Sequence, residues 1–113
     1  FSGTQTSDIR LKKNVTDLGP VLGILENLNP IRFYYKEGVY DENPHIGLSA
    51  QEVESFFPEL VYTAPEAGNK LVFYDKLTVV LVQALKDLKK EKDEEIKDLR
   101  GRIEALEQRL NDL

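Results

Sequence analysis

The chain has no cysteine and one histidine, His45, among its 113 residues. Without cysteine there is no disulfide framework, no thiol nucleophile and no thiolate metal site. One imidazole does not make a multi-histidine metal site, and a serine–histidine–aspartate arrangement would depend on His45 alone. We therefore expect neither a metal nor a cofactor.

Long apolar runs and an excess of positive charge are also missing. No apolar run approaches the roughly 18 residues that a membrane helix needs, and no basic-then-apolar signal pattern opens the chain. The net charge is −5, with acidic residues interleaved among the basic ones, which argues against binding the phosphates of a nucleic acid. No glycine-rich phosphate loop occurs. The sequence predicts no membrane partner and no nucleic-acid partner.

What is present predicts an α+β fold in two parts. Residues 7–73 have short strand and helix patterns, and residues 74–113 have the pattern of one long helix. Roughly 70 residues form only a marginally stable core, so a partner chain is expected. The chain begins with Phe1 rather than Met, and we interpret residues 1–6 as the end of an upstream passenger in a longer protein.

The expected elements of the first part are short. In chain order they are a helix over 21–28, strands over 31–35 and 45–48, a short helix ending before Pro58, and a hairpin of strands over 60–62 and 71–73. Ser49 precedes that short helix and Glu52 follows three residues later, which is the spacing of a capping box. Pro30 ends the first helix.

The helix from Tyr74 would be about 60 Å long at 1.5 Å per residue, so most of it extends beyond its own small core. Its apolar residues follow heptad spacing and should meet another chain; they are Leu81, Leu85, Leu88, Ile96, Leu99, Ile103, Leu106, Leu110 and Leu113. Joining the two halves through Lys92 requires a stutter, which predicts a weaker bundle over 89–95. Isoleucine at a with leucine at d usually favours dimers, so the heptads do not fix the number of chains. The alternative is a marginal helix frayed at its end.

Ser7 and Lys12 are the candidate pair for chemistry, because a serine becomes a nucleophile only when a neighbouring base takes its proton. A spacing of five residues places them on opposite faces of a strand and well apart on a helix. The backbone must therefore turn between them, or the pair must form between chains. Taken alone, Ser7 reads as an ordinary turn serine and Lys12 as a solvated cation.

Two motifs change that interpretation. The first is Ser7, Asp8, Arg10, Leu11 and Lys12; the second runs over 46–54 and 57–61, with Gly47, Tyr74 and Leu77 in matching places. Together they resemble the C-terminal intramolecular chaperone domain of phage endosialidases, tail spikes and tail fibres, which is also similar to a domain of myelin regulatory factor. The similarity extends from Ser7 to about Lys89. Ser49 departs from the family pattern, and we interpret it as a helix cap.

The resemblance implies a function. It implies a homotrimer held by a coiled coil, which assists folding of an upstream β-rich fibre protein in the host cytoplasm during virion assembly. It also implies that Ser7 and Lys12 form a serine–lysine dyad, a serine endopeptidase that acts once and cuts the Thr6–Ser7 bond. The cut releases the domain from the mature tail protein.

Several other residues are candidates for supporting this site, namely Asp8, Arg10, His45, Gln51 and Glu52. His45 could instead be a surface or interface residue, and Gln51 and Glu52 could simply solvate a helix face. The competing function is a non-catalytic trimerisation or adaptor module that stays attached. A third alternative is a cleavage-competent chain captured before cutting.

Overall fold

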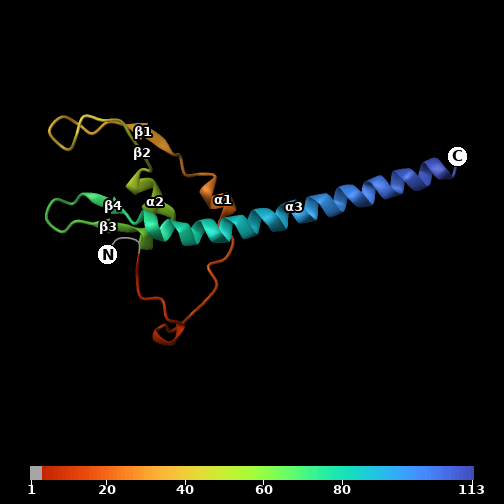
Figure 1. Ribbon diagram of the computed structural model, residues 1–113, viewed down its shortest axis with the longest axis horizontal. Coiled ribbons are helices and arrows are strands. Elements are labelled where there is room, and N and C mark those ends of the chain that lie inside the picture. Colours follow the sequence, from red (N-terminus) through yellow and green to blue (C-terminus); the bar gives the residue numbers. More distant parts are fainter. Residues whose placement is uncertain (1–3) are drawn as a thin grey trace.

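The computed structural model describes residues 4–113 and is elongated, with extents of 76 × 42 × 22 Å. Its radius of gyration is 21.7 Å, whereas a compact domain of this length would have about 13 Å. Figure 1 shows the reason: a small mixed part lies at one end of a single long helix, whose other end is free. The predicted α+β fold, with short strands and helices before a long C-terminal helix, is confirmed. Residues 1–3, half of the predicted passenger end, lie outside the described residues.

Helix α1 covers Leu22–Leu25 and is much shorter than the predicted helix over 21–28. Its N-cap, Val21, has no side chain that could accept a hydrogen bond from the first turn. After Leu25 the backbone tightens, because Leu28 N–H donates to the carbonyl of Leu25 at 3.0 Å, three residues back. Such bonds end an α-helix, so the apolar pattern marked the buried face correctly but overstated the helix length.

Strands β1 (Ile31–Phe33) and β2 (His45–Gly47) form an antiparallel pair, with Ile31 opposite Gly47. Both are shorter than predicted. Past Phe33, the ring of Tyr35 packs against Tyr40 at a centroid distance of 4.6 Å and against His45 at 5.0 Å. These aromatic contacts close the loop of the hairpin in place of further strand pairing.

Helix α2 covers Ala50–Phe56 and begins as predicted at Ser49, whose Oγ accepts a hydrogen bond from Glu52 N–H at 3.3 Å. The reciprocal half of the predicted capping box is wrong. The Glu52 carboxylate accepts from Asn29 N–H at 2.6 Å instead of from Ser49. The contact with Asn29 thus uses the Glu52 carboxylate that the sequence spacing assigned to the local cap. It also ties the chain before β1 to α2.

A 3-10 turn, η2 (Pro58–Leu60), leads into the second antiparallel pair, β3 (Val61–Thr63) and β4 (Lys70–Val72). The predicted hairpin exists, with β3 one residue later and β4 one residue earlier than expected. Leu60 belongs to η2 and is buried in the core rather than paired in the strand. The two hairpins form separate two-stranded sheets.

Helix α3 covers Tyr74–Asn111 and begins at the predicted residue. Its first third completes the core through Val80 and Ala84. The buried residues come from α2, η2 and α3, from the caps Val21 and Phe57, and from the segment after α1: Val21, Leu28, Val53, Phe57, Leu60, Val80 and Ala84. This core is small, so α3 both closes the mixed part and extends beyond it.

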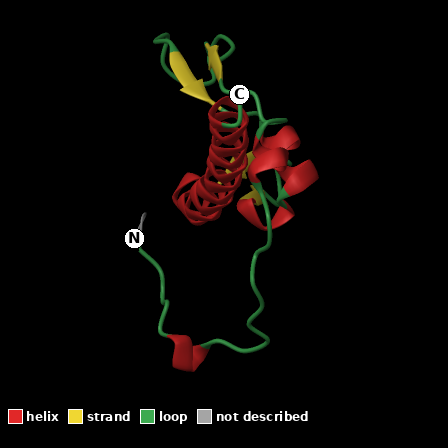
Figure 2. Cartoon of the chain, turned by 90° about the vertical axis from the view of Figure 1, so that its right-hand side faces the viewer, coloured by secondary structure: helices red, strands yellow, loops and turns green. Residues whose placement is uncertain are grey.

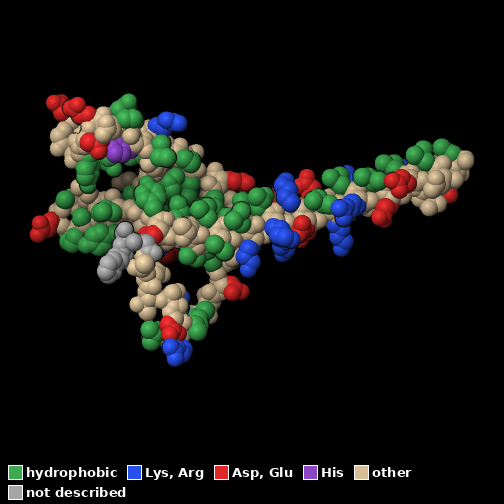
Figure 3. Space-filling view, viewed as in Figure 1, with side chains coloured by type: hydrophobic (Ala, Val, Ile, Leu, Met, Phe, Trp, Pro, Cys, Tyr) green, Lys and Arg blue, Asp and Glu red, His purple; other side chains and the backbone are tan. Residues whose placement is uncertain are grey.

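The predicted heptad residues of α3 are uncovered in the single chain. Their exposed fractions run from 40% for Leu88 to 67% for Leu85 and Leu110, and Leu113, just after the helix, is 100% exposed. Figure 3 shows apolar side chains continuing along the helix toward its C-terminus. The helix is unbroken through Lys92. The number of chains remains a prediction.

Candidate functional site

Ser7 and Lys12 lie on the N-terminal arm, which we define as residues 4–20. Figure 1 shows the arm running to a short turn at its tip and then returning to α1. Figure 2 shows the same loop standing away from α3 in the perpendicular view. Every residue from Thr4 to Leu18 is exposed, so the arm is held by contacts at its base and within itself.

The tip of the arm is a 3-10 turn, η1 (Ile9–Leu11). Leu11 N–H donates to the carbonyl of Asp8 at 3.0 Å, and Lys12 N–H donates to that of Ile9 at 3.1 Å. Asp8 is the N-cap, with extended backbone and a side chain that accepts from Arg10 N–H at 2.9 Å. The turn reverses the backbone between Ser7 and Lys12.

As a consequence, the Lys12 Nζ lies 2.9 Å from the Ser7 Oγ and is hydrogen-bonded to it. The sequence left open whether a turn or a second chain would bring the two together, and in this structure the turn does so within one chain. A nucleophilic hydroxyl and its base need such a separation, and the base must be neutral when it takes the proton. The pair therefore has the geometry for proton transfer from serine to lysine.

Asp8 and Arg10 form a forked ion pair beside the dyad. Arg10 Nη2 lies 2.7 Å from Asp8 Oδ2, and Arg10 Nε lies 3.1 Å from Asp8 Oδ1. The side-chain hydrogen bond from Arg10, and then its backbone N–H, lower the pKa of Asp8. The same side-chain bond raises the pKa of Arg10. The two residues that the sequence offered as support for the site thus contact each other and build the turn.

The other candidates for support lie elsewhere. His45 Nε2 is 2.9 Å from Asp41 Oδ1, and its ring stacks on Phe33 at a centroid distance of 5.7 Å. Figure 3 shows the histidine over the β1–β2 hairpin, on the other side of α3 from the tip of the arm. Gln51 and Glu52 bond to Ser49 and Asn29.

Within the described residues, no hydrogen bond joins His45, Gln51 or Glu52 to the dyad. Their support of the site therefore stays a prediction. In the His45 pair, the backbone N–H of Asn43 and then the His45 ring lower the pKa of Asp41. The pair stabilises the loop of the hairpin in which it lies.

Asp87 on α3 is a residue that the sequence did not identify. Its Oδ2 accepts from Val21 N–H at 2.7 Å and from Leu22 N–H at 3.1 Å, while Gln83 Nε2 donates to its Oδ1 at 2.8 Å. These contacts, led by the Val21 backbone bond, lower the pKa of Asp87. Asp87 caps α1 from a distance and fixes the base of the arm. The only sign of such a residue in the local sequence is that Val21, at the start of α1, has no side chain that could cap the helix.

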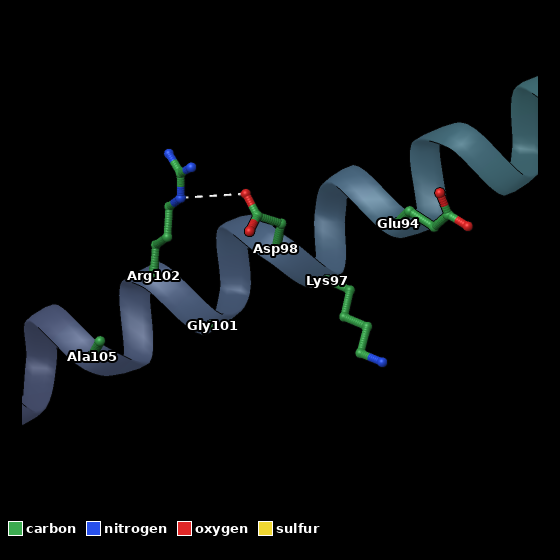
Figure 4. Close-up of a pocket in the computed structure, with 6 residues that line it drawn as sticks. All are labelled: Glu94, Lys97, Asp98, Gly101, Arg102 and Ala105. Carbon is green, nitrogen blue, oxygen red and sulfur yellow. Dashed lines mark ion pairs between the residues drawn. The ribbon is translucent and has the colours of Figure 1, made fainter.

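A hollow lies along α3. Figure 4 shows its lining, which comes from one helix alone: Glu94, Lys97, Asp98, Gly101, Arg102 and Ala105. Arg102 Nε lies 3.3 Å from Asp98 Oδ2 across it. The hollow exists because Gly101 has no side chain, and nothing faces it from another element.

Among residues 4–113, no group of three or more acidic, histidine or cysteine side chains could hold a metal ion. The helices in this part of the chain are too short or too polar to cross a bilayer.

The structure thus combines an exposed hydroxyl–amine pair on an arm with a small α+β part and a long helix whose apolar stripe is uncovered in the single chain. Residues 7–62, about half of the chain, match the peptidase family described as chaperone of endosialidase. The chain belongs to this family of intramolecular chaperones. No curated protein matches the chain.

Proposed function

We propose that this chain is an intramolecular chaperone that trimerises through α3, assists the folding of an upstream fibrous phage tail protein, and cuts itself free at the Thr6–Ser7 bond. The observation that carries the proposal is the 2.9 Å hydrogen bond between Lys12 Nζ and Ser7 Oγ, directly beside that bond. The resemblance of the Ser7–Lys12 motif to the family supplies the roles. The passenger is a β-rich fibre, and the cut takes place in the host cytoplasm during virion assembly.

The cut needs one proton acceptor and one water. Lys12, as a neutral amine, takes the hydroxyl proton of Ser7, and the Ser7 oxygen attacks the carbonyl carbon of Thr6. The Thr6–Ser7 C–N bond then breaks, its nitrogen takes the proton back, and an ester remains. Water hydrolyses the ester, which leaves a carboxylate on Thr6 and the free hydroxyl of Ser7. A serine of a neighbouring chain is the alternative nucleophile for the same net reaction.

Assembly precedes the cut in this proposal. The exposed heptad residues of α3 associate three chains, which raises the local concentration of the passenger ends and sets their register. After release, the passenger no longer has the template on which it equilibrated, so its folded state is held by a kinetic barrier. Single use of the domain follows from the loss of the Thr6–Ser7 bond.

The test is the intact mass of a chain extended upstream of Phe1, recorded beside Ser7→Ala and Lys12→Ala, with oligomer size measured on the same samples. Cleavage of the native chain alone, with a product that begins at Ser7, is the expected result. Three uncut samples of equal oligomer size would contradict self-cleavage. That outcome would favour the attached adaptor, with which the exposure of Ser7 and Lys12 in one chain agrees.

A further inference from the structure

We infer that Asp8 and Arg10 are positioning residues for the proposed self-cleavage: their ion pair folds the η1 turn and keeps the Asp8 carboxylate off the Lys12 amine. This inference rests on the proposed function and assigns two roles within the same site. It concerns how the dyad is assembled from residues that share one short turn.

The turn has little else to hold it. No residue of η1 is buried, and two backbone hydrogen bonds close it. Fixing the backbone of an exposed turn costs conformational entropy, which those two bonds must offset in water. The Asp8 carboxylate also accepts a hydrogen bond from Arg10 N–H at 2.9 Å, and the Arg10 guanidinium donates to the same carboxylate. The side chains of Asp8 and Arg10 therefore supply the remaining stabilisation of the turn that brings Lys12 to Ser7.

Both carboxylate oxygens of Asp8 are used by Arg10. Oδ1 accepts from the backbone N–H at 2.9 Å and from Nε at 3.1 Å. Oδ2 accepts from Nη2 at 2.7 Å and from Nε at 3.2 Å. A planar guanidinium fits a carboxylate in this forked way, and a lysine amine does not. Arg10 thus occupies both oxygens of the carboxylate that is closest to Lys12 in the sequence.

An occupied Asp8 carboxylate also matters for the base. A free carboxylate beside a lysine stabilises the charged amine, which has no lone pair with which to accept the serine proton. The other charged groups of the arm are Asp8, Arg10, Lys13 and Asp17. Among the described residues, no hydrogen bond or ion pair joins these groups to another element. Arg10 is thus the residue that occupies Asp8 while Lys12 stays on Ser7.

Cleavage rates of the upstream-extended chain against pH test this role. Arg10→Ala frees Asp8, and we expect its rate–pH curve to move to higher pH, with a loss of about tenfold at neutral pH for each unit of that movement. The double variant Asp8→Asn with Arg10→Ala removes the freed charge. Its curve returns toward the native position, and at neutral pH it cuts faster than Arg10→Ala alone.

If the Asp8–Arg10 ion pair only shaped the turn, the double variant, which has lost both partners, would cut no faster than Arg10→Ala alone. Lys13→Ala is the matched control, since it removes one positive charge from the arm and leaves the Asp8–Arg10 pair intact. An equal movement of the curve in Lys13→Ala would overturn the inference in favour of a general charge effect. Circular dichroism and oligomer size check that each variant is folded.

Failure of the inference is distinguishable from failure of the proposed function. A native chain that stays uncut overturns the function. If the native chain cuts while Ser7→Ala and Lys12→Ala are inert and Arg10→Ala keeps the native rate and pH curve, only the role of the Asp8–Arg10 ion pair is overturned. Hydrogen exchange at Arg10 Nε, measured by NMR on Ser7→Ala, reports on the Asp8–Arg10 ion pair in a chain that does not cut itself. We expect slower exchange there than at Arg109, and equal exchange would show that the ion pair does not hold in solution.

Discussion

The hydroxyl oxygen of Tyr74, the first residue of α3, accepts a hydrogen bond from the backbone N–H of Leu48 at 2.9 Å. This bond ties the end of β2 to the start of the long helix across 26 positions of sequence. The same oxygen lies 2.8 Å from where a Cβ on Gly47 would stand. The absence of a side chain at Gly47 therefore leaves the room that the Tyr74 hydroxyl occupies.

Gly47→Ala should destabilise the fold by about 1–3 kcal/mol, the usual range for inserting a methyl group where there is no room. The new methyl would displace Tyr74 and break its bond to Leu48. Tyr74→Phe loses the bond alone and should cost about 0.5–1.5 kcal/mol. Urea unfolding at one protein concentration measures both. Gly47→Ala should cost less in the Tyr74→Phe background, and equal costs in the two backgrounds would contradict the clash.

Ile103→Asp should disrupt association through α3. Ile103 is 53% exposed in the single chain and lies in the heptad stripe, and a charge buried between helices without a partner is strongly unfavourable. We expect association to weaken by about tenfold or more, at roughly 1.4 kcal/mol for each factor of ten. Sedimentation equilibrium reads the change. Ala105→Asp, on the face with Gly101, is the control and should leave the oligomer size unchanged.

Asp87→Asn should lower the thermal stability at neutral pH, because the charged carboxylate is the better acceptor for Val21 and Leu22. The contacts of Asp87 lower its pKa in the folded chain. Their stabilising effect is therefore complete above the unfolded pKa, about 3.9 for aspartate, and disappears as pH falls through the still lower folded value. Tm measured from pH 7 to pH 3 should show the native and variant curves converging below about pH 4. A constant gap over that range would contradict the assigned role.

Gly101→Ala should stabilise α3 by about 0.5–1 kcal/mol, since glycine in a helix has more backbone freedom to lose than alanine. Nothing lies within 4 Å of the added Cβ, so the change meets no clash. Helicity at 222 nm during heating measures the gain. Lower helicity or a smaller oligomer would show instead that the hollow at Gly101 receives a side chain of another molecule.

Sequence reasoning succeeded where the signal was local. The start of α3 at Tyr74 follows from the end of the turn-rich region, and the Ser49 cap follows from a preference within four residues. A turn between Ser7 and Lys12 was one of two alternatives, the other being a pair between chains, because their spacing of five residues fits neither a strand nor a helix. The fold class followed from element lengths and from a helix too long for its own core.

The remaining features depend on contacts distant in sequence. Glu52 bonds to Asn29, 23 positions away, and so leaves the local capping box half formed. Asp87 caps α1 from 66 positions away, and no local pattern marks an acceptor that belongs to another helix. The aromatic contacts that shorten β1 and β2 depend on how Tyr35, Tyr40 and His45 meet once the hairpin has closed.

The free end of α3 makes the molecule modular. Among the described residues, no hydrogen bond or ion pair joins residues 95–111 to any other element, whereas Val80, Ala84 and Asp87 anchor the first part of the helix. The segment can therefore be exchanged for heptads of another strand number without disturbing the arm or the core. Such chimaeras would set valency and chemistry separately, and would show how much of the cutting reaction depends on the number of neighbours around each arm.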